Sequence, residues 1–254
     1  LDGASEDALV TGFCERAAAA GIPICQALVI IDTLHPVYEG RLFRWGQDPS
    51  KPGMVEYGRT AAPEGLSLGE DEERAAQNWR RSPFFHLLQT GETLLRRHTN
   101  EESFAEFPVI RDYYEAGATE YVAIVNRFAP DGVIGEMDCV YSSWLTKASA
   151  GFSDEQVDVL NRILPTLALA VKTTALTRMN ATLMQTYLGR DAARRVLSGR
   201  IMRGVADRID AVIWFSDLRG FPRVTDSAPE QVIPLLRYTL RHALRELLVA
   251  ALWV

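Results

Sequence analysis

A single carboxylate at the end of an apolar run is the residue in this sequence best placed to do chemistry. Residues 211–221 read AVIWFSDLRGF, which predicts a short buried strand running directly into Asp217 and a turn at Gly220. A helix start signal follows at residues 227–230. This order places a carboxylate beside the backbone amides of residues 219–221 at a helix N-terminus. Mg²⁺-bound triphosphate chemistry requires this combination of a hard oxygen ligand and amide donors.

Asp217 also has a simpler interpretation. An aspartate between an apolar strand and a helix is commonly a turn former or a helix cap. Taken alone, Asp217 favours that structural role, and only its sequence context favours a metal ligand.

That context resembles the opening strand and turn of the class III adenylate/guanylate cyclase catalytic domain, whose motif reads Phe-x-Asp-(Leu/Ile)-x-Gly-Phe-Thr. The matching residues are Phe215, Asp217, Leu218, Gly220 and Phe221. The sequence departs from the motif at Pro222, where the family usually has threonine, and proline has no N–H to offer a phosphate.

The resemblance implies a role for each matched position. Asp217 would bind two Mg²⁺ or Mn²⁺ ions, and the backbone carbonyl of Leu218 would help to bind one of them. The phosphate-binding turn would consist of Arg219, Gly220 and Phe221. The implied reaction is adenylate cyclase activity, in which ATP is converted to cyclic AMP and pyrophosphate by a two-metal mechanism. ATP is the default substrate by analogy, since the residues that would choose between ATP and GTP are not in the sequence.

The sequence stops at Val254, before the second metal-binding aspartate that the family carries after the helix. We therefore expect a C-terminally truncated cyclase domain over residues 209–254, with no complete catalytic set and no activity in this chain alone. The alternative is a non-enzymatic sensing or dimerisation module in which the cyclase segment is vestigial.

Residues 1–172 predict an α+β domain. The expected order is a helix over residues 6–20, strands at 27–31, 38–45 and 54–57, and helices around 83–90 and 107–116. An extended segment at 94–97 and strands at 120–126 and 133–142 complete the sheet, and a long helix begins after Ser153. This order resembles a GAF-like sensor domain, as do the short sequence segments at residues 32–36, 43–45 and 151–155.

Residues 173–208 predict a helical signalling linker. Its apolar positions continue at helical spacing and could form a parallel seam between two copies of the chain at Leu176, Met179, Leu183 and Tyr187. A solvated amphipathic helix is the alternative. We expect a homodimer, because class III cyclase sites form at a dimer interface.

A GAF-like fold binds small molecules between its sheet and the covering helices. The pocket candidates are His86, Tyr113 and Tyr114, although most aromatic residues of the domain are expected to fill the core. Residues 96–98, Arg-Arg-His, could contact an anion or form a solvated edge. Nothing in the sequence identifies the sensor ligand.

Composition narrows the functional classes. A net charge of −6 over 254 residues argues against nonspecific nucleic-acid binding. The longest apolar run, residues 247–254, is too short to cross a bilayer, so we expect a cytoplasmic protein without membrane insertion. Cys14, Cys25 and Cys139 lack metal-binding spacing and are expected to be reduced thiols.

Overall fold

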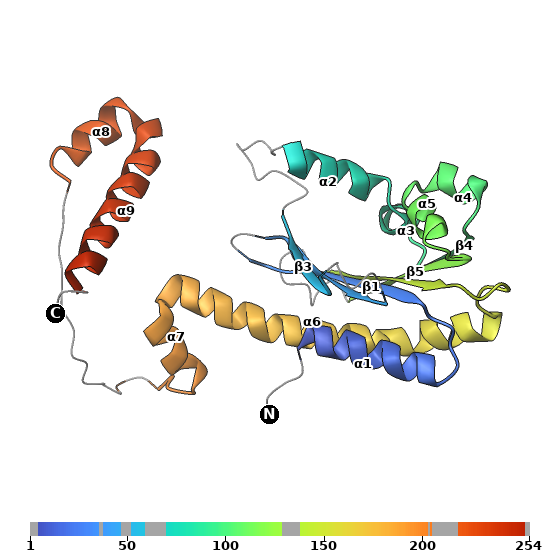
Figure 1. Cartoon of the computed structure of the whole chain (residues 1–254). Helices are drawn as coiled ribbons and strands as arrows, with labels where there is room; N and C mark the ends of the chain where they lie inside the picture. Colours follow the sequence, from blue (N-terminus) through green and yellow to red (C-terminus); the bar gives the residue numbers. More distant parts are fainter. Residues whose placement is uncertain are drawn as a thin grey trace. The chain divides into compact units, whose positions relative to one another are not determined.

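The described part of the chain falls into two units, Leu1–Ile201 and Met202–Val254. The computed structural model describes residues 5–35, 38–46, 52–58, 70–128, 138–202, 204 and 218–251. The first unit contains a sheet and its helices, and the described part of the second unit is helical (Figure 1). The division after Ile201 lies inside the stretch expected to be a linker, whereas the boundary expected after residue 172 lies inside a continuous helix.

A six-stranded antiparallel sheet forms the centre of the first unit. Its order is β3-β2-β1-β6-β5-β4, so strands from the two ends of the domain sequence pair in the middle. The strands are β1 (Gln26–Asp32), β2 (Gly40–Trp45), β3 (Met54–Tyr57), β4 (Leu94–His98), β5 (Glu120–Arg127) and β6 (Cys139–Thr146). The mixed α/β organisation predicted for this region is confirmed.

Side chains on the two faces of the sheet enter two separate cores. On β1, Val29 and Ile31 face one core, and Leu28 and Ile30 face the other, as the two-residue period of a strand requires. All of the residues of β6 are buried, because helices cover both faces at the centre of the sheet. The last predicted strand overlaps β6 at residues 139–142; β6 continues to Thr146, and residues 133–137 lie outside the described part.

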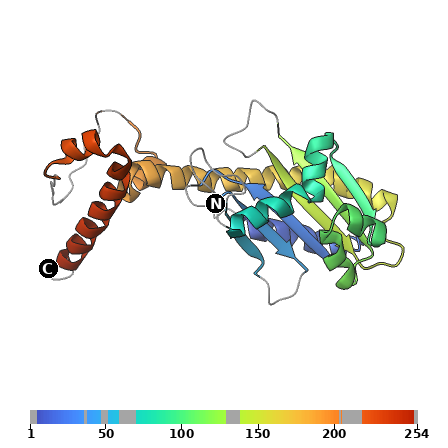
Figure 2. The same cartoon turned by 90° about the horizontal axis from the view of Figure 1, so that it is seen from above.

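Helices α1 (Glu6–Ala19) and α6 (Asp154–Leu188) lie side by side over one face of the sheet (Figure 1, Figure 2). Ser153 and Gln156 form a capping box at the start of α6, so the predicted helix start is observed. The other face is covered by shorter helices, which are α2 (Glu70–Arg80), α3 (Pro83–Thr90), α4 (Glu101–Glu106) and α5 (Val109–Glu115).

Most of the predicted seam on α6 packs within its own domain. Met179 is buried, and Leu176 and Leu183 lie against the core that α1 and α6 share, whereas Tyr187 is 82% exposed. By length and composition α6 could also span a membrane, with a mean hydropathy of 1.2 in its most apolar window. Core helices of folded domains share these properties, and the buried side of α6 packs on the sheet.

A buried carboxylate connects the start of α6 to the sheet. Glu120 on β5 is fully buried and accepts hydrogen bonds from the Phe152 backbone N–H at 2.6 Å and from Arg96 Nε at 2.5 Å. Arg96 also pairs with Asp154, and Arg97 pairs with Glu106. The arginines considered as an anion contact are therefore already paired with carboxylates of the chain.

The remaining helices follow α6 in sequence. Helix α7 (Arg190–Leu197) belongs to the first unit and begins after Gly189, whose φ of +78° suits glycine. The second unit contains α8 (Phe221–Ser227), a 3-10 turn η2 (Pro229–Gln231) and α9 (Val232–Ala251). The helix expected after residue 229 is observed as η2 and α9, and α8 was not predicted. The strand expected at residues 211–215 lies outside the described residues.

Candidate functional site

A cavity with a volume of about 710 Å³ lies between the sheet and α5. We call it the sheet–α5 pocket. Its volume falls within the range of small-molecule binding sites. The lining residues are Gln26, Leu28, Leu42, Arg44, Pro52, Val55, Val109, Asp112, Tyr113 and Ala116.

The pocket residues follow from the two-residue period of the strands and the helical spacing of α5. Leu42 and Arg44 lie on the same face of β2, and Leu42 pairs with Val55 of β3 while Arg44 pairs with Leu28 of β1. Val109, Asp112, Tyr113 and Ala116 recur at the spacing of one helix face at α5 and its C-terminal end. The wall formed by the strands and the wall formed by α5 are both mainly apolar.

Opposite charges lie in this apolar pocket. Arg44 on β2 is half-buried, and its Nη1 donates a long hydrogen bond of 3.5 Å to the Pro52 carbonyl. Asp112 on α5 supplies a negative charge near the hydroxyl of Tyr113. Burial raises the pKa of Tyr113; the positive charge of Arg44 opposes this rise and Asp112 adds to it. The Tyr113 phenol is therefore neutral at physiological pH and can donate a hydrogen bond.

Of the three pocket candidates from the sequence, Tyr113 alone lines the sheet–α5 pocket. Its ring stacks on Tyr121 with centroids 5.6 Å apart. Tyr114 is mostly exposed and packs against Phe104, and His86 packs against Phe107. The structure does not bring these three side chains together.

Sequence reasoning missed Arg44, Leu42, Val55 and Asp112 as pocket residues. The alternation along residues 40–45 could have placed Leu42 and Arg44 on one face. The pairing of that face with α5 is a tertiary contact, and no local pattern indicates it.

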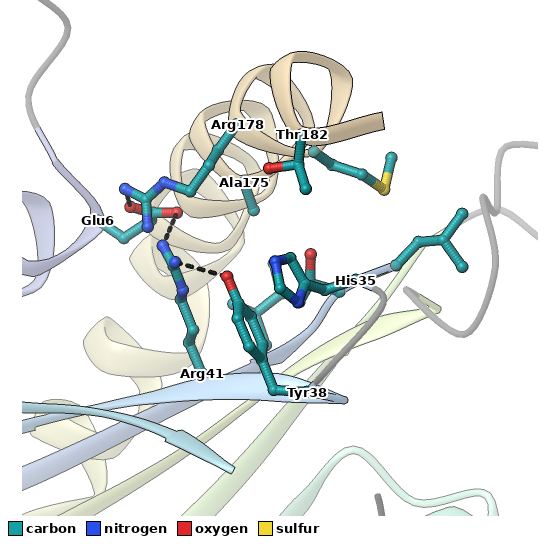
Figure 3. Close-up of a pocket in the computed structure, with 11 residues that line it drawn as sticks. Glu6, His35, Tyr38, Arg41, Ala175, Arg178 and Thr182 are labelled. Atoms are coloured by element: carbon teal, nitrogen blue, oxygen red, sulfur yellow. Dashed lines mark hydrogen bonds and ion pairs between the residues drawn. The ribbon is translucent and has the colours of Figure 1, made fainter. Parts of the chain in front are cut away.

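A second, smaller cavity lies at the opposite face of the sheet, among α1, β2 and α6 (Figure 3). Its volume of about 10 Å³ is near that of one water molecule. Three charged side chains meet there: Glu6 of α1, Arg41 of β2 and Arg178 of α6. We call these three residues the Glu6 cluster.

The predicted metal and phosphate site is only partly within the described residues. Asp217 lies outside them. Leu218 and Gly220 precede α8, and the Leu218 carbonyl accepts a hydrogen bond from the Phe221 N–H at 3.1 Å. The Leu218 carbonyl was expected to bind a metal and the Phe221 amide to bind phosphate, but in this conformation the two groups are hydrogen-bonded to each other. Arg219 lies in the same turn.

Within the described residues, no group of three or more His, Cys, Asp or Glu side chains is placed to bind a metal ion. Cys14, Cys25 and Cys139 are free thiols, and burial raises the pKa of Cys14 to about 12. We derive no metal-dependent step from the residues that the structure describes.

Comparisons with known proteins identify distant structural neighbours only. No protein-family model and no curated protein matches the chain. The structure is similar to the GAF domain of a two-component sensor histidine kinase from Bacillus halodurans, with 9% identity, a TM-score of 0.38, and 66% of this chain and 95% of that chain covered. It is also similar to Escherichia coli SdiA, with 13% identity, a TM-score of 0.35 and 79% of each chain covered.

Because both TM-scores are below 0.5, we base no functional assignment on either neighbour. One of the two neighbours is a GAF domain, the kind of domain that residues 1–172 resemble in sequence. No family model and no curated protein supports the class III cyclase resemblance of residues 215–221.

Proposed function

We propose that this chain is a sensing module that binds a small molecule in the sheet–α5 pocket. The observation that supports this function is the combination of a cavity of about 710 Å³, mainly apolar walls and a few polar groups. The long helix α6 leads from the opposite face of the same sheet and is suited to carry a response.

We further propose that the ligand has an apolar body and an anionic group. Leu28, Leu42 and Val55 form an apolar floor against which a ring or an alkyl chain can pack. Arg44 supplies a guanidinium at the edge of that floor, and a guanidinium forms two parallel hydrogen bonds with a carboxylate. The Tyr113 hydroxyl offers a further donor on the opposite wall.

The charge preference can be tested with a matched pair of probes, 2-naphthoate and 2-naphthamide, in calorimetric titrations of the full chain. In Arg44→Gln, naphthoate should bind about tenfold more weakly, because a partly exposed charged hydrogen bond contributes about 1.5 kcal/mol. Naphthamide affinity should stay within about twofold, since the neutral probe forms no ion pair.

Arg162→Gln on the exposed surface of α6 is the matched control and should leave both affinities unchanged. Equal weakening of the two probes in Arg44→Gln would contradict the proposed ion pair. Failure of both probes to bind the wild-type chain would contradict the proposed pocket.

Adenylate cyclase activity is the more specific function implied by residues 215–221, and we do not propose it for this chain as a working activity. Asp217, the carboxylate of that motif, lies outside the described residues, and no group of three or more His, Cys, Asp or Glu side chains within the described residues is placed to bind a metal ion. We expect purified chain incubated with Mn²⁺ and ATP to form no cyclic AMP above background. Cyclic AMP formation that disappears in Asp217→Ala would contradict this expectation.

The other expectations stay proposals. Self-association is supported by exposed apolar side chains on α6, namely Leu169, Met184 and Tyr187, and a second copy is the partner we propose for them. A cytoplasmic location, the absence of nucleic-acid partners and the absence of membrane insertion rest on composition alone.

A further inference from the structure

The Glu6 cluster joins three elements that are distant in sequence. Glu6 is only 1% exposed, and its Oε2 forms an ion pair with Nη2 of Arg178 on α6. Its Oε1 lies 3.9 Å from Nη1 of Arg41 on β2. The Glu6 carboxylate therefore lies between the two guanidinium groups (Figure 3).

Arg41 is also held from the side of the sheet. Its Nη2 donates to Glu56 Oε1 of β3 at 2.6 Å and to the Tyr38 hydroxyl at 2.8 Å. The carboxylates of Glu6 and Glu56 thus balance the guanidinium groups of Arg41 and Arg178, and removal of any one of the four leaves an unbalanced charge.

The contact between Glu6 and Arg41 is incomplete. Glu6 Oε1 and the Arg41 atoms Nε and Nη1 are buried and have no hydrogen-bond partner among the described residues. The 3.9 Å gap exceeds a direct charged hydrogen bond by about 1 Å. The adjacent cavity has room for one water molecule. A small displacement of β2 would therefore bring Glu6 and Arg41 into direct hydrogen-bond contact.

The same two strands contribute to the ligand pocket. Arg41 is followed on β2 by Leu42, which lines the sheet–α5 pocket on the opposite face. Glu56 is likewise preceded on β3 by Val55, another pocket residue. Because neighbouring residues of a strand face opposite sides, a shift of β2 or β3 caused by a ligand also moves the groups that hold Arg41.

Arg178 lies near the end of the packed part of α6. Met179 is buried, whereas residues 180–188 are half-buried or exposed. The ion pair between Arg178 and Glu6 therefore lies where the buried side of α6 ends. Its strength affects how firmly the next turns of α6 are held against the rest of the domain.

We propose that the Glu6 cluster couples β2 and β3 to the C-terminal half of α6, so that occupancy of the sheet–α5 pocket changes how firmly that half is held. The coupling by ligand rests on the proposed sensing function. The coupling between the strands and α6 does not, and it can be tested without any ligand.

The test is hydrogen exchange by mass spectrometry on the full chain, comparing residues 176–188 with residues 157–171 of the same helix. Glu56→Gln removes a charge on β3 and no described contact of α6. This variant should speed exchange over residues 176–188 about threefold or more and leave residues 157–171 unchanged. The reason is that Arg41 loses a partner, which weakens the contact of Arg41 with Glu6 and the hold of Glu6 on Arg178. Arg178→Gln should have a larger effect on the same segment.

Glu115→Gln, an exposed carboxylate on α5, is the matched control and should change neither segment. Faster exchange in Arg178→Gln alone would overturn the coupling, because the cluster would then be a local ion pair. Equal effects on both segments would also overturn it, because they would report global destabilisation.

The dependence on ligand is tested by repeating the hydrogen-exchange measurement with saturating 2-naphthoate. The probe should change exchange over residues 176–188 in wild type, and this change should be lost in Arg178→Gln at unchanged probe affinity. A response that persists in Arg178→Gln would overturn the route through the cluster. Absence of probe binding would contradict the sensing function, and the result for Glu56→Gln would still decide the coupling.

Discussion

Replacing Glu120 with alanine should lower the free energy of unfolding by about 3 kcal/mol, in the range measured for the loss of one partner from a buried ion pair. Glu120 is fully buried and satisfies the Phe152 N–H just before α6. Alanine would leave that amide without an acceptor, and Arg96 would retain Asp154 as its ion-pair partner. Urea unfolding followed by tryptophan fluorescence would measure the loss.

Two further variants distinguish the causes. Glu120→Gln keeps an acceptor for the Phe152 N–H but removes the charge, so about half of the loss should remain. Glu115→Ala removes an exposed carboxylate and should change stability by no more than about 0.5 kcal/mol. A loss below about 1 kcal/mol in Glu120→Ala would show that the buried carboxylate is not what connects β5 to α6.

Replacing Ala116 with tryptophan should reduce the affinity for 2-naphthoate by tenfold or more, that is, by at least about 1.4 kcal/mol. Ala116 lies at the C-terminal end of α5 and lines the sheet–α5 pocket, so a large side chain there competes with the ligand for the same volume. Ala116 is exposed, and the substitution does not overfill a packed core. The melting temperature should therefore change by no more than about 2 °C, which a thermal scan of the same samples would establish.

The parts of the fold that the sequence predicts well are those with local signals. The start of α6 is encoded by Ser153 and Gln156, and the end of α3 by Gly91 in the left-handed conformation. The short strand β3 was also expected at its observed residues.

The missed elements lack such signals. Helix α2 carries many charged residues, and among its side chains that the structure describes Ala76 is the one that is buried. The end of β6 at Thr146 was missed because all of its residues are buried, so no alternation marks where the strand ends.

The candidate site was predictable only in part, because its residues meet through tertiary contacts. Tyr113 was recognised as an aromatic candidate, but nothing local indicates that Arg44 faces the same cavity. The Glu6 cluster is harder still to predict, since Glu6 and Arg178 are 172 positions apart in sequence. Asp217 carried the strongest chemical pattern in the sequence, and it lies outside the described residues.

The most direct test of the sensing function is a calorimetric titration of 2-naphthoate into the wild-type chain and Ala116→Trp, run side by side. The sheet–α5 pocket predicts saturable binding at one site in wild type and a loss of tenfold or more in the variant, both proteins being equally folded. Equal affinity in the two proteins, or no binding to wild type, would contradict the claim that this pocket is the sensing site.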